Sequence, residues 1–139
     1  MSNQQYLNSI KPGAIDGWHK YKIAPSITGA QAALESGWGS SKLAKPPYNN
    51  NFGIKASPDW TGRKISMSTQ EYVNGRWITI NDDFRAYDTL SDSIADHSAF
   101  FTNTEWRKNN YREVVGQIDY KKAANALQKA GYATDPGVS

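Results

Sequence analysis

The sequence contains no cysteine among its 139 residues. This absence excludes a cysteine nucleophile and thiolate metal sites, and it means that the fold is stable without disulfides. A chain of this length can bury a core large enough for that purpose. It also has room for only one domain of ordinary size, so we treat residues 1–139 as a single domain.

Histidine is scarce as well, since His19 and His97 are the only two. They show neither an HExxH motif nor another ligand spacing, which disfavours a zinc hydrolase. We expect each of them to be a surface or packing residue. The chain also lacks a GxSxG nucleophile elbow, a phosphate-binding loop and a dinucleotide fingerprint. Hydrolysis by carboxylates is the chemistry that survives these exclusions.

Long apolar runs and blocks of one charge are missing too. No run approaches the length of a membrane span, and the N-terminal segment MSNQQYLNSIK has no apolar signal-peptide core. Lysine and arginine are scattered, without the block that marks a nucleic-acid-binding arm. We therefore expect no membrane and no nucleic acid as partner. A net charge of +3 and a pI of about 9.1 still predict weak attraction to polyanions such as wall teichoic acids.

Aromatic residues, in contrast, are abundant at 12%, with five Trp and eight Tyr. This is more than a small core needs. Flat rings of this kind stack on sugar faces in carbohydrate clefts, although they also bury large areas in ordinary packing. The composition is compatible with either use.

The N-terminal third has the apolar spacing of helices. Tyr6 and Ile10 lie at helical steps, and Pro12 predicts the start of a second helix that carries Trp18. The clearest helix is PSITGAQAALESG, with Pro25 in its first turn and Gly37 as its stop. Its predicted apolar stripe consists of Ile27, Ala30 and Leu34.

Glu35 falls in the last turn of that helix, where a carboxylate is electrostatically disfavoured. The carbonyl end of a helix carries partial negative charge, so a carboxyl group there holds its proton more tightly. Partial burial has the same effect. Both effects favour a carboxyl that stays protonated near neutral pH, as a general acid must.

The middle of the chain changes to a period of two. Residues 65–69 and 77–80 predict two strands, joined by a tight turn at Asn74-Gly75, and DFRAYD predicts a third. Helices return after Thr89 and after Asp119, which are predicted N-caps, and the last helix is predicted to end at Gly131. Helices interrupted by one small antiparallel sheet indicate an α+β fold.

Two acidic residues in this layout suit the hydrolysis of a glycosidic bond. That reaction needs a proton donor for the leaving oxygen and a second group on the opposite face of the sugar. A helix-borne Glu35 facing a hairpin-borne Glu71 meets this need, while Asp82, Asp83 and Asp135 are the other candidates.

The sequence resembles the glucosaminidases of glycoside hydrolase family 73 from about residue 3 to residue 136. The strings that carry this resemblance stand in the family's order and spacing; they are PSITGAQAALESGWGSSKLA, NNNFGIKA, STQEYVNGRW, FRAYDTLSDSIADH and GYATDP. AQAALESGWG together with NNNFGIK is highly specific. The family includes bacterial autolysins, flagellar wall-piercing enzymes and phage endolysins.

The resemblance implies a lysozyme-like fold, in which a helical lobe and a small β lobe flank a groove for a glycan strand. It implies cleavage of the β-1,4 bond between N-acetylglucosamine and N-acetylmuramic acid in peptidoglycan, without a metal or another cofactor. The enzyme would act as a monomer outside the cell, after secretion or release by a phage. Family domains usually continue past GYATDP, so the resemblance also implies a domain trimmed at its C-terminus, without a wall-binding module.

The resemblance assigns roles to single residues. Glu35 stands where the family's catalytic acid stands, and Glu71 matches a second acidic residue on a mobile hairpin. Tyr132 matches a tyrosine thought to line the site, with Asp135 in the same string. Further expected substrate-binding residues, at the cleft floor or along the groove, are Asn51, Phe52, Gly53 and Tyr111. Asn51 is equally compatible with holding its loop through backbone hydrogen bonds, and core packing is favoured for Phe52.

Alternatives stay open at this level. Glu71 could activate water and give inversion. Alternatively, the substrate's 2-acetamido oxygen could attack first and form an oxazolinium intermediate that Tyr132 or Asp135 stabilises, which gives retention. A muramidase or a lytic transglycosylase would act on the same polymer. A non-catalytic glycan-binding module and a nucleic-acid binder are the alternatives from other classes.

Overall fold

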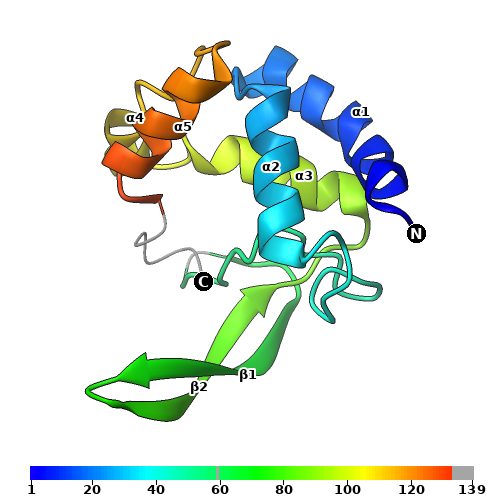
Figure 1. The fold of residues 1–139 in the computed structure, drawn as a ribbon, viewed down its shortest axis with the longest axis vertical. Helices are drawn as coiled ribbons and strands as arrows, with labels where there is room; N and C mark the ends of the chain where they lie inside the picture. The colour runs from blue at the N-terminus through cyan, green and yellow to red at the C-terminus, as the bar shows by residue number, and fades with distance from the viewer. Residues whose placement is uncertain (59, 133–139) are drawn as a thin grey trace.

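The computed structural model describes residues 1–58 and 60–132, and at positions 69 and 71 it describes the backbone only. Helices gather into one lobe and a long β-hairpin projects from it (Figure 1). The elements in chain order are α1 (Asn3–Tyr21), α2 (Pro25–Ser36), β1 (Lys64–Val73), β2 (Arg76–Arg85), α3 (Leu90–Phe100), α4 (Glu105–Asn110) and α5 (Tyr120–Lys129). The predicted α+β class is confirmed.

Helix α1 is one continuous helix, so the prediction of a second helix at Pro12 was wrong. A proline inside a helix costs about 3 kcal/mol because it removes a hydrogen bond and crowds the preceding turn. Burial of one face, which includes Tyr6 and Ile10 on one side of Pro12 and Ala14 on the other, offsets this cost. Ser2 and Gln5 close a reciprocal capping box at its start.

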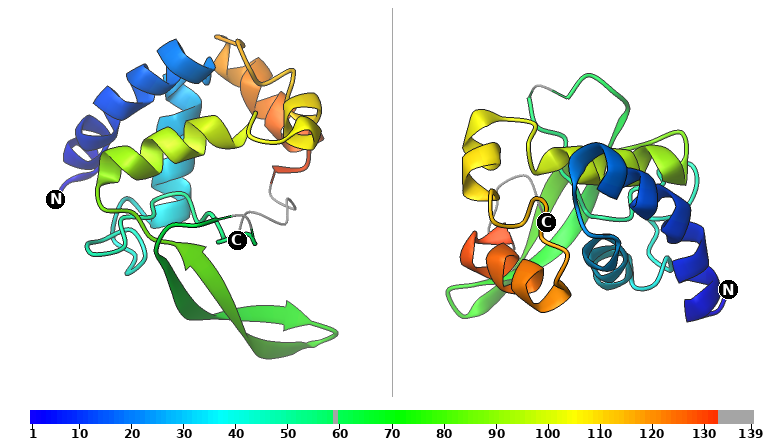
Figure 2. Two further views of the ribbon diagram at one scale, coloured as in Figure 1. Left: turned by 180° about the vertical axis from the view of Figure 1, so that it is seen from behind. Right: turned by 90° about the horizontal axis from the view of Figure 1, so that it is seen from above.

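Close packing joins α1 to α3 through two glycines. A Cβ atom at Gly13 would lie 2.9 Å from side-chain atoms of Ile94, and one at Gly17 would collide with Ser98. Both glycines therefore let the two helices approach more closely than a larger residue would allow. Helix α3 crosses behind α2 in Figure 1, and in the left view of Figure 2, which is seen from behind, it crosses in front of α2.

Helix α2 begins and ends where the sequence predicts. Pro25 occupies its first turn, and Gly37 is its C-cap with a φ of 57°. The predicted apolar stripe was wrong, however, because Leu34 is 81% exposed. The buried face consists of small and polar residues besides Ile27; these are Thr28, Ala32, Ala33 and Ser36. In an alanine-rich helix several faces have similar hydrophobicity. In α2 the face with the smaller side chains packs against the neighbouring elements.

The hairpin pairs β1 with β2 antiparallel, from Lys64 opposite Arg85 to Val73 opposite Arg76. Asn74 and Gly75 both have positive φ, 51° and 81°, as the predicted two-residue turn requires. The prediction of a separate third strand at DFRAYD was wrong.

Strand β2 continues through this segment because its two aspartates take part in the ladder instead of forming a loop. Asp82 lies opposite Met67, and Asp83 lies opposite Ser66 and accepts a hydrogen bond from its hydroxyl. A single bridge between Lys55 and Phe84 is the third-strand pairing recorded in the described part of the chain.

The C-terminal helices begin at the predicted caps. The Thr89 side chain accepts from the backbone N–H of Asp92, and Asp119 accepts from Lys121 and Lys122. Helix α5 ends at Lys129, close to the predicted stop at Gly131. Aromatic rings from α3 and from the segments after α4 and α5 meet in the core beside these helices; they are Phe100, Phe101, Tyr111 and Tyr132.

Candidate functional site

Glu35 lies half-buried in the last turn of α2, as the sequence predicts. Burial raises the pKa of the Glu35 carboxyl above its ordinary value, because the charged form loses solvation. The C-terminal position on α2 favours the protonated form as well. In Figure 1 this end of α2 points toward the base of the hairpin. Position 35 therefore combines a place at the end of a helix with a pKa shifted in the direction that suits a proton donor.

Three side chains anchor the end of α2 that carries Glu35. The Tyr6 hydroxyl donates to Asn51 Oδ1 over 2.8 Å and lies 2.9 Å from Ser36 Oγ. Ser36 Oγ also accepts from the backbone N–H of Gly39. This buried network ties α2 to α1 and to the loop at residues 49–53, so it fixes the residue next to the acid.

Asn51 is 2% exposed, and its amide nitrogen donates to the carbonyls of Ala44 and Asn49. It holds the loop, one of the two roles expected for it. The sequence analysis missed the neighbouring Asn50, which donates to the carbonyls of Ile54 and Arg85. Repeated asparagines in NNN are a signal for such side-chain-to-backbone bonds.

Phe52 and Gly53 lie beneath the surface of this loop. Phe52 is fully buried and stacks on the His97 ring with 3.9 Å between ring centroids. Gly53 is buried and has a φ of 64°, in the left-handed region that favours glycine. Both residues therefore support the loop from the protein interior, and neither is exposed to solvent.

Tyr132 and Tyr111 belong to the aromatic cluster beside α3. Tyr111 is fully buried, and Tyr132 is 7% exposed and stacks on Phe101 at 5.7 Å between centroids. The two tyrosine rings also meet edge to face at 6.2 Å. Tyr132 therefore has a fixed position after α5, while the predicted site residue Asp135 lies outside the described residues.

The hairpin carries the second predicted carboxyl. Position 71 pairs with Ile78, close to the turn, where the sequence places it. The other acidic candidates are engaged in ion pairs: Asp82 lies 3.7 Å from the Lys55 ammonium group and Asp83 lies 3.7 Å from that of Lys64.

His97 is a packing residue, which is one of the two roles predicted for it. Its ring is completely buried, and burial lowers its pKa to about 3, so it is neutral at physiological pH. Its Nε2 atom lies 2.7 Å from Oε1 of Gln31 on α2. The sequence analysis missed this partner, which is 66 residues away in the chain.

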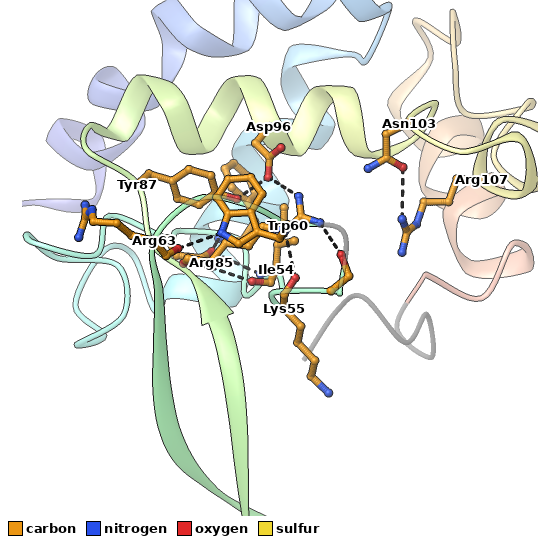
Figure 3. Close-up of polar contacts among 12 residues, drawn as sticks. Ile54, Lys55, Trp60, Arg63, Arg85, Tyr87, Asp96, Asn103 and Arg107 are labelled. Carbon is orange, nitrogen blue, oxygen red and sulfur yellow. Dashed lines mark hydrogen bonds and ion pairs between the residues drawn. The ribbon is translucent and has the colours of Figure 1, made fainter.

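A second cluster that the sequence analysis missed fixes the base of the hairpin (Figure 3). The Arg85 guanidinium is 4.6 Å above the Trp60 ring and donates to Asp96 over 2.9 Å and to the Lys55 carbonyl over 3.0 Å. Tyr87 donates its hydroxyl to the same Asp96 carboxylate. Burial, with the charge of Asp96, raises the pKa of Tyr87. The string FRAYD thus connects β2 to α3.

A cavity of about 700 Å³ lies beside this cluster and is lined by residues such as Trp60, Tyr87 and Asp92. Neither Glu35 nor Tyr132 lines it. The Tyr87 hydroxyl, which belongs to its lining, already donates a hydrogen bond to Asp96. The residues that line this cavity do not include Glu35, and we place the candidate site at Glu35 because its carboxyl has the raised pKa.

Within residues 1–58 and 60–132 no group of three or more histidine and acidic side chains gathers as a metal site would require. Over the same residues, no helix has the length and apolar character needed to cross a bilayer.

Comparison with known proteins gives the family. The glucosaminidase family, described as mannosyl-glycoprotein endo-beta-N-acetylglucosaminidase, matches residues 11–137. Exo-glucosaminidase LytG of Bacillus subtilis is 43% identical over 134 residues, which are 96% of this chain and 46% of LytG. A probable N-acetylmuramidase of Lactococcus lactis is 34% identical over 97% of this chain and 31% of its own length. The chain thus spans less than half of these curated relatives.

A solved structure extends the agreement to three dimensions. The catalytic domain of the autolysin Auto from Listeria monocytogenes has a TM-score of 0.83 and 39% identity, covering 96% of this chain and 76% of that one. The expected lysozyme-like arrangement of a helical lobe with a β-hairpin is confirmed. The chain belongs to the glucosaminidase family of glycoside hydrolases.

Proposed function

We propose that this domain cleaves the β-1,4 bond between N-acetylglucosamine and N-acetylmuramic acid in peptidoglycan, with Glu35 as the proton donor. The observation that carries the proposal is a half-buried carboxyl with a raised pKa, at the end of α2, in a glucosaminidase domain. Glu35 protonates the bridging oxygen as the bond breaks. The substrate places the site of action in the cell wall.

The opposite face of the sugar has two candidate groups. Inversion requires a second carboxyl about 6.5–9.5 Å from the acid, with a water between them. Position 71 lies seven residues along β1 from Lys64 at the hairpin base, which is about 23 Å at about 3.3 Å per residue. Because the hairpin projects from the helical lobe (Figure 1), Glu71 would reach the bond only after the hairpin closes over the substrate.

Retention needs no such closure. The 2-acetamido oxygen of the substrate would attack the anomeric carbon, with Tyr132 or Asp135 stabilising the charged intermediate. The fixed position of Tyr132 against Phe101 supports its part in this route. Asn51, Phe52, Gly53 and Tyr111 would then shape the floor from beneath the surface. Proton NMR of the first anomer released distinguishes the two outcomes.

The central test is the substitution Glu35→Gln, which keeps the shape of the side chain and removes the proton. We expect clearing of purified walls to fall by about 10²–10⁴-fold, the contribution of general acid catalysis. Glu105→Gln at the start of α4 is the matched control, because Glu105 is exposed and serves no part of the site. Clearing at the wild-type rate by Glu35→Gln would end the proposal.

A muramidase is the second candidate, favoured by the name of the Lactococcus relative. Mass spectrometry of borohydride-reduced products separates the possibilities. A glucosaminidase leaves reduced glucosamine, a muramidase leaves reduced muramic acid, and a lytic transglycosylase leaves an anhydro product. A non-catalytic glycan-binding module would release none of them.

A further inference from the structure

Gln31 lies on α2 one helical turn before Glu35. Residues four positions apart share one face of a helix, with Cβ atoms about 5–6 Å apart. The Gln31 side chain is only partly buried, although the His97 ring that it contacts is completely buried. It therefore links the packed interior to the face of α2 that carries the acid.

The contact with His97 fixes the orientation of the Gln31 amide. An amide oxygen can only accept a hydrogen bond, so the 2.7 Å contact requires His97 Nε2 to carry the ring proton and donate it. The other ring nitrogen, Nδ1, is then a bare acceptor, and in the described part of the chain no hydrogen-bond partner is found for it. A buried acceptor without a partner is tolerated better than a buried donor. The His97 tautomer with its proton on Nε2 is therefore consistent with the contact to Gln31.

The His97 ring is itself held in place. It stacks on Phe52 at 3.9 Å and meets Phe101 edge to face at 5.2 Å between centroids. Burial lowers its pKa to about 3 and so keeps the ring neutral over the whole physiological range. The donor to Gln31 is thus present at every pH at which the enzyme would work.

His97 engages one lone pair of the Gln31 amide oxygen, and the amide nitrogen carries two N–H donors. No acceptor from residues 1–58 or 60–132 binds its nitrogen. These two N–H groups can bind an acceptor oxygen of a ligand, and a carbonyl oxygen, which accepts without donating, is such a group. Under the proposed function the substrate carries such a carbonyl on every ring, in its 2-acetamido group.

We propose that Gln31 is a substrate-binding residue whose amide N–H groups bind the acetamido carbonyl of a sugar next to Glu35, and that His97 positions it. This assignment rests on the proposed function, because it takes an N-acetylated glycan as the ligand. Neither residue transfers a proton. The pair gives the site a preference for N-acetylated over N-deacetylated sugars.

Binding measurements in the inactive Glu35→Gln background test this assignment. The probes are soluble, uncrosslinked glycan strands from purified peptidoglycan and the same strands after chemical N-deacetylation, with affinities measured by calorimetry. Adding Gln31→Leu should weaken binding of the acetylated strands by about three- to tenfold, the range for one or two neutral hydrogen bonds. The affinity for the N-deacetylated strands should be the same with and without Gln31→Leu. Gln128→Leu, at an exposed position of α5, is the matched control and should change neither.

His97→Phe tests the positioning role, because it keeps a ring on Phe52 and removes only the donor. It should weaken binding of acetylated strands less than Gln31→Leu does, and the double variant should bind as Gln31→Leu alone. Equal losses on both strand types, additive effects of the two substitutions, or unchanged affinity would each overturn the assignment. Thermal melting of each variant shows whether the lobe has stayed folded.

Failure of the proposed function gives a different result. If the Glu35→Gln parent binds neither strand type and the wild type clears no walls, the glycan is not the ligand and both proposals fall. If the wild type clears walls while Gln31→Leu keeps full affinity for acetylated strands, only the role of Gln31 is refuted.

Discussion

At the scale of single residues, the raised pKa of Glu35 has a consequence for stability. A carboxyl whose pKa is higher in the folded than in the unfolded protein makes the folded state bind more protons between the two values. The free energy of unfolding therefore falls as pH rises through this interval and stays lower above it. The strain on the ionised carboxylate is present at neutral pH and absent in acid.

We expect Glu35→Gln to increase the free energy of unfolding at pH 7, because the neutral amide needs no proton. The advantage should vanish below the ordinary pKa of a glutamate, where both side chains are uncharged. Urea unfolding of the two proteins from pH 3.5 to pH 8 measures it. Two outcomes would contradict the assignment of the Glu35 pKa shift to burial. The variant could be less stable than the wild type at pH 7, or its gain in stability could be the same at every pH.

Removal of the Tyr6 hydroxyl should also change the free energy of unfolding. Tyr6→Phe removes the group between Ser36 and Asn51 and leaves two buried polar atoms with one partner fewer, at a cost of about 1–3 kcal/mol. Tyr72→Phe on the hairpin, where the side chain is 63% exposed, should cost almost nothing. Equilibrium unfolding in urea compares them. Equal stabilities would mean that the network does not hold the end of α2.

Residue-scale predictions succeeded where the interaction is local. Thr89 and Asp119 were predicted as caps because a capping bond spans only two or three residues. The contacts of Tyr6 with Asn51 and of His97 with Gln31 span 45 and 66 residues, and no periodicity in the sequence pairs them. The location of Glu35 could be predicted, whereas the side chains that anchor it could not.

At the scale of elements, the base of the hairpin depends on a buried ion pair. Asp96→Asn would leave the Arg85 guanidinium, which is 5% exposed, without its counter-charge. Removing one partner of a buried pair costs about 3–5 kcal/mol. We expect such a loss in urea unfolding, together with slower clearing of walls, because the hairpin would no longer be tied to α3.

Asp88→Asn provides the comparison for that prediction. Its partner Arg63 is half exposed and its own side chain is 83% exposed, so the loss should be at most about 1 kcal/mol. If both variants lose the same stability, the Arg85 cluster contributes no more than a surface pair. Both substitutions remove one negative charge, so the difference between the two losses of stability measures the effect of burying the ion pair.

The errors at this scale have one cause, which is that packing overrides local propensity. Pro12 and the aspartates of DFRAYD are breaker signals in isolation, yet α1 and β2 run through them. Packing of α1 on α3 and pairing of β2 with β1 stabilise these segments more than the breaker residues destabilise them. The Asn74-Gly75 turn was predicted correctly because its positive φ angles are a property of those two residues themselves.

At the scale of the whole molecule, the net charge of +3 bears on how the domain would approach the proposed wall substrate. Bacterial walls that carry anionic polymers attract a basic protein over roughly the screening length, which is about 10 Å at 0.1 M salt and about 3 Å at 1 M. The acid chemistry at the half-buried Glu35 is screened much less. Association with the wall and cleavage of the glycan should therefore respond to salt differently.

We expect the bound fraction on intact walls to fall as sodium chloride rises from about 0.05 M to about 0.5 M, a range over which the screening length falls below 5 Å. Turnover of soluble, uncrosslinked glycan strands should change far less. Walls stripped of their anionic polymers provide the control, and binding to them should depend little on salt. Salt dependence of equal size on stripped and intact walls would show that scattered surface charge has no part in locating the substrate.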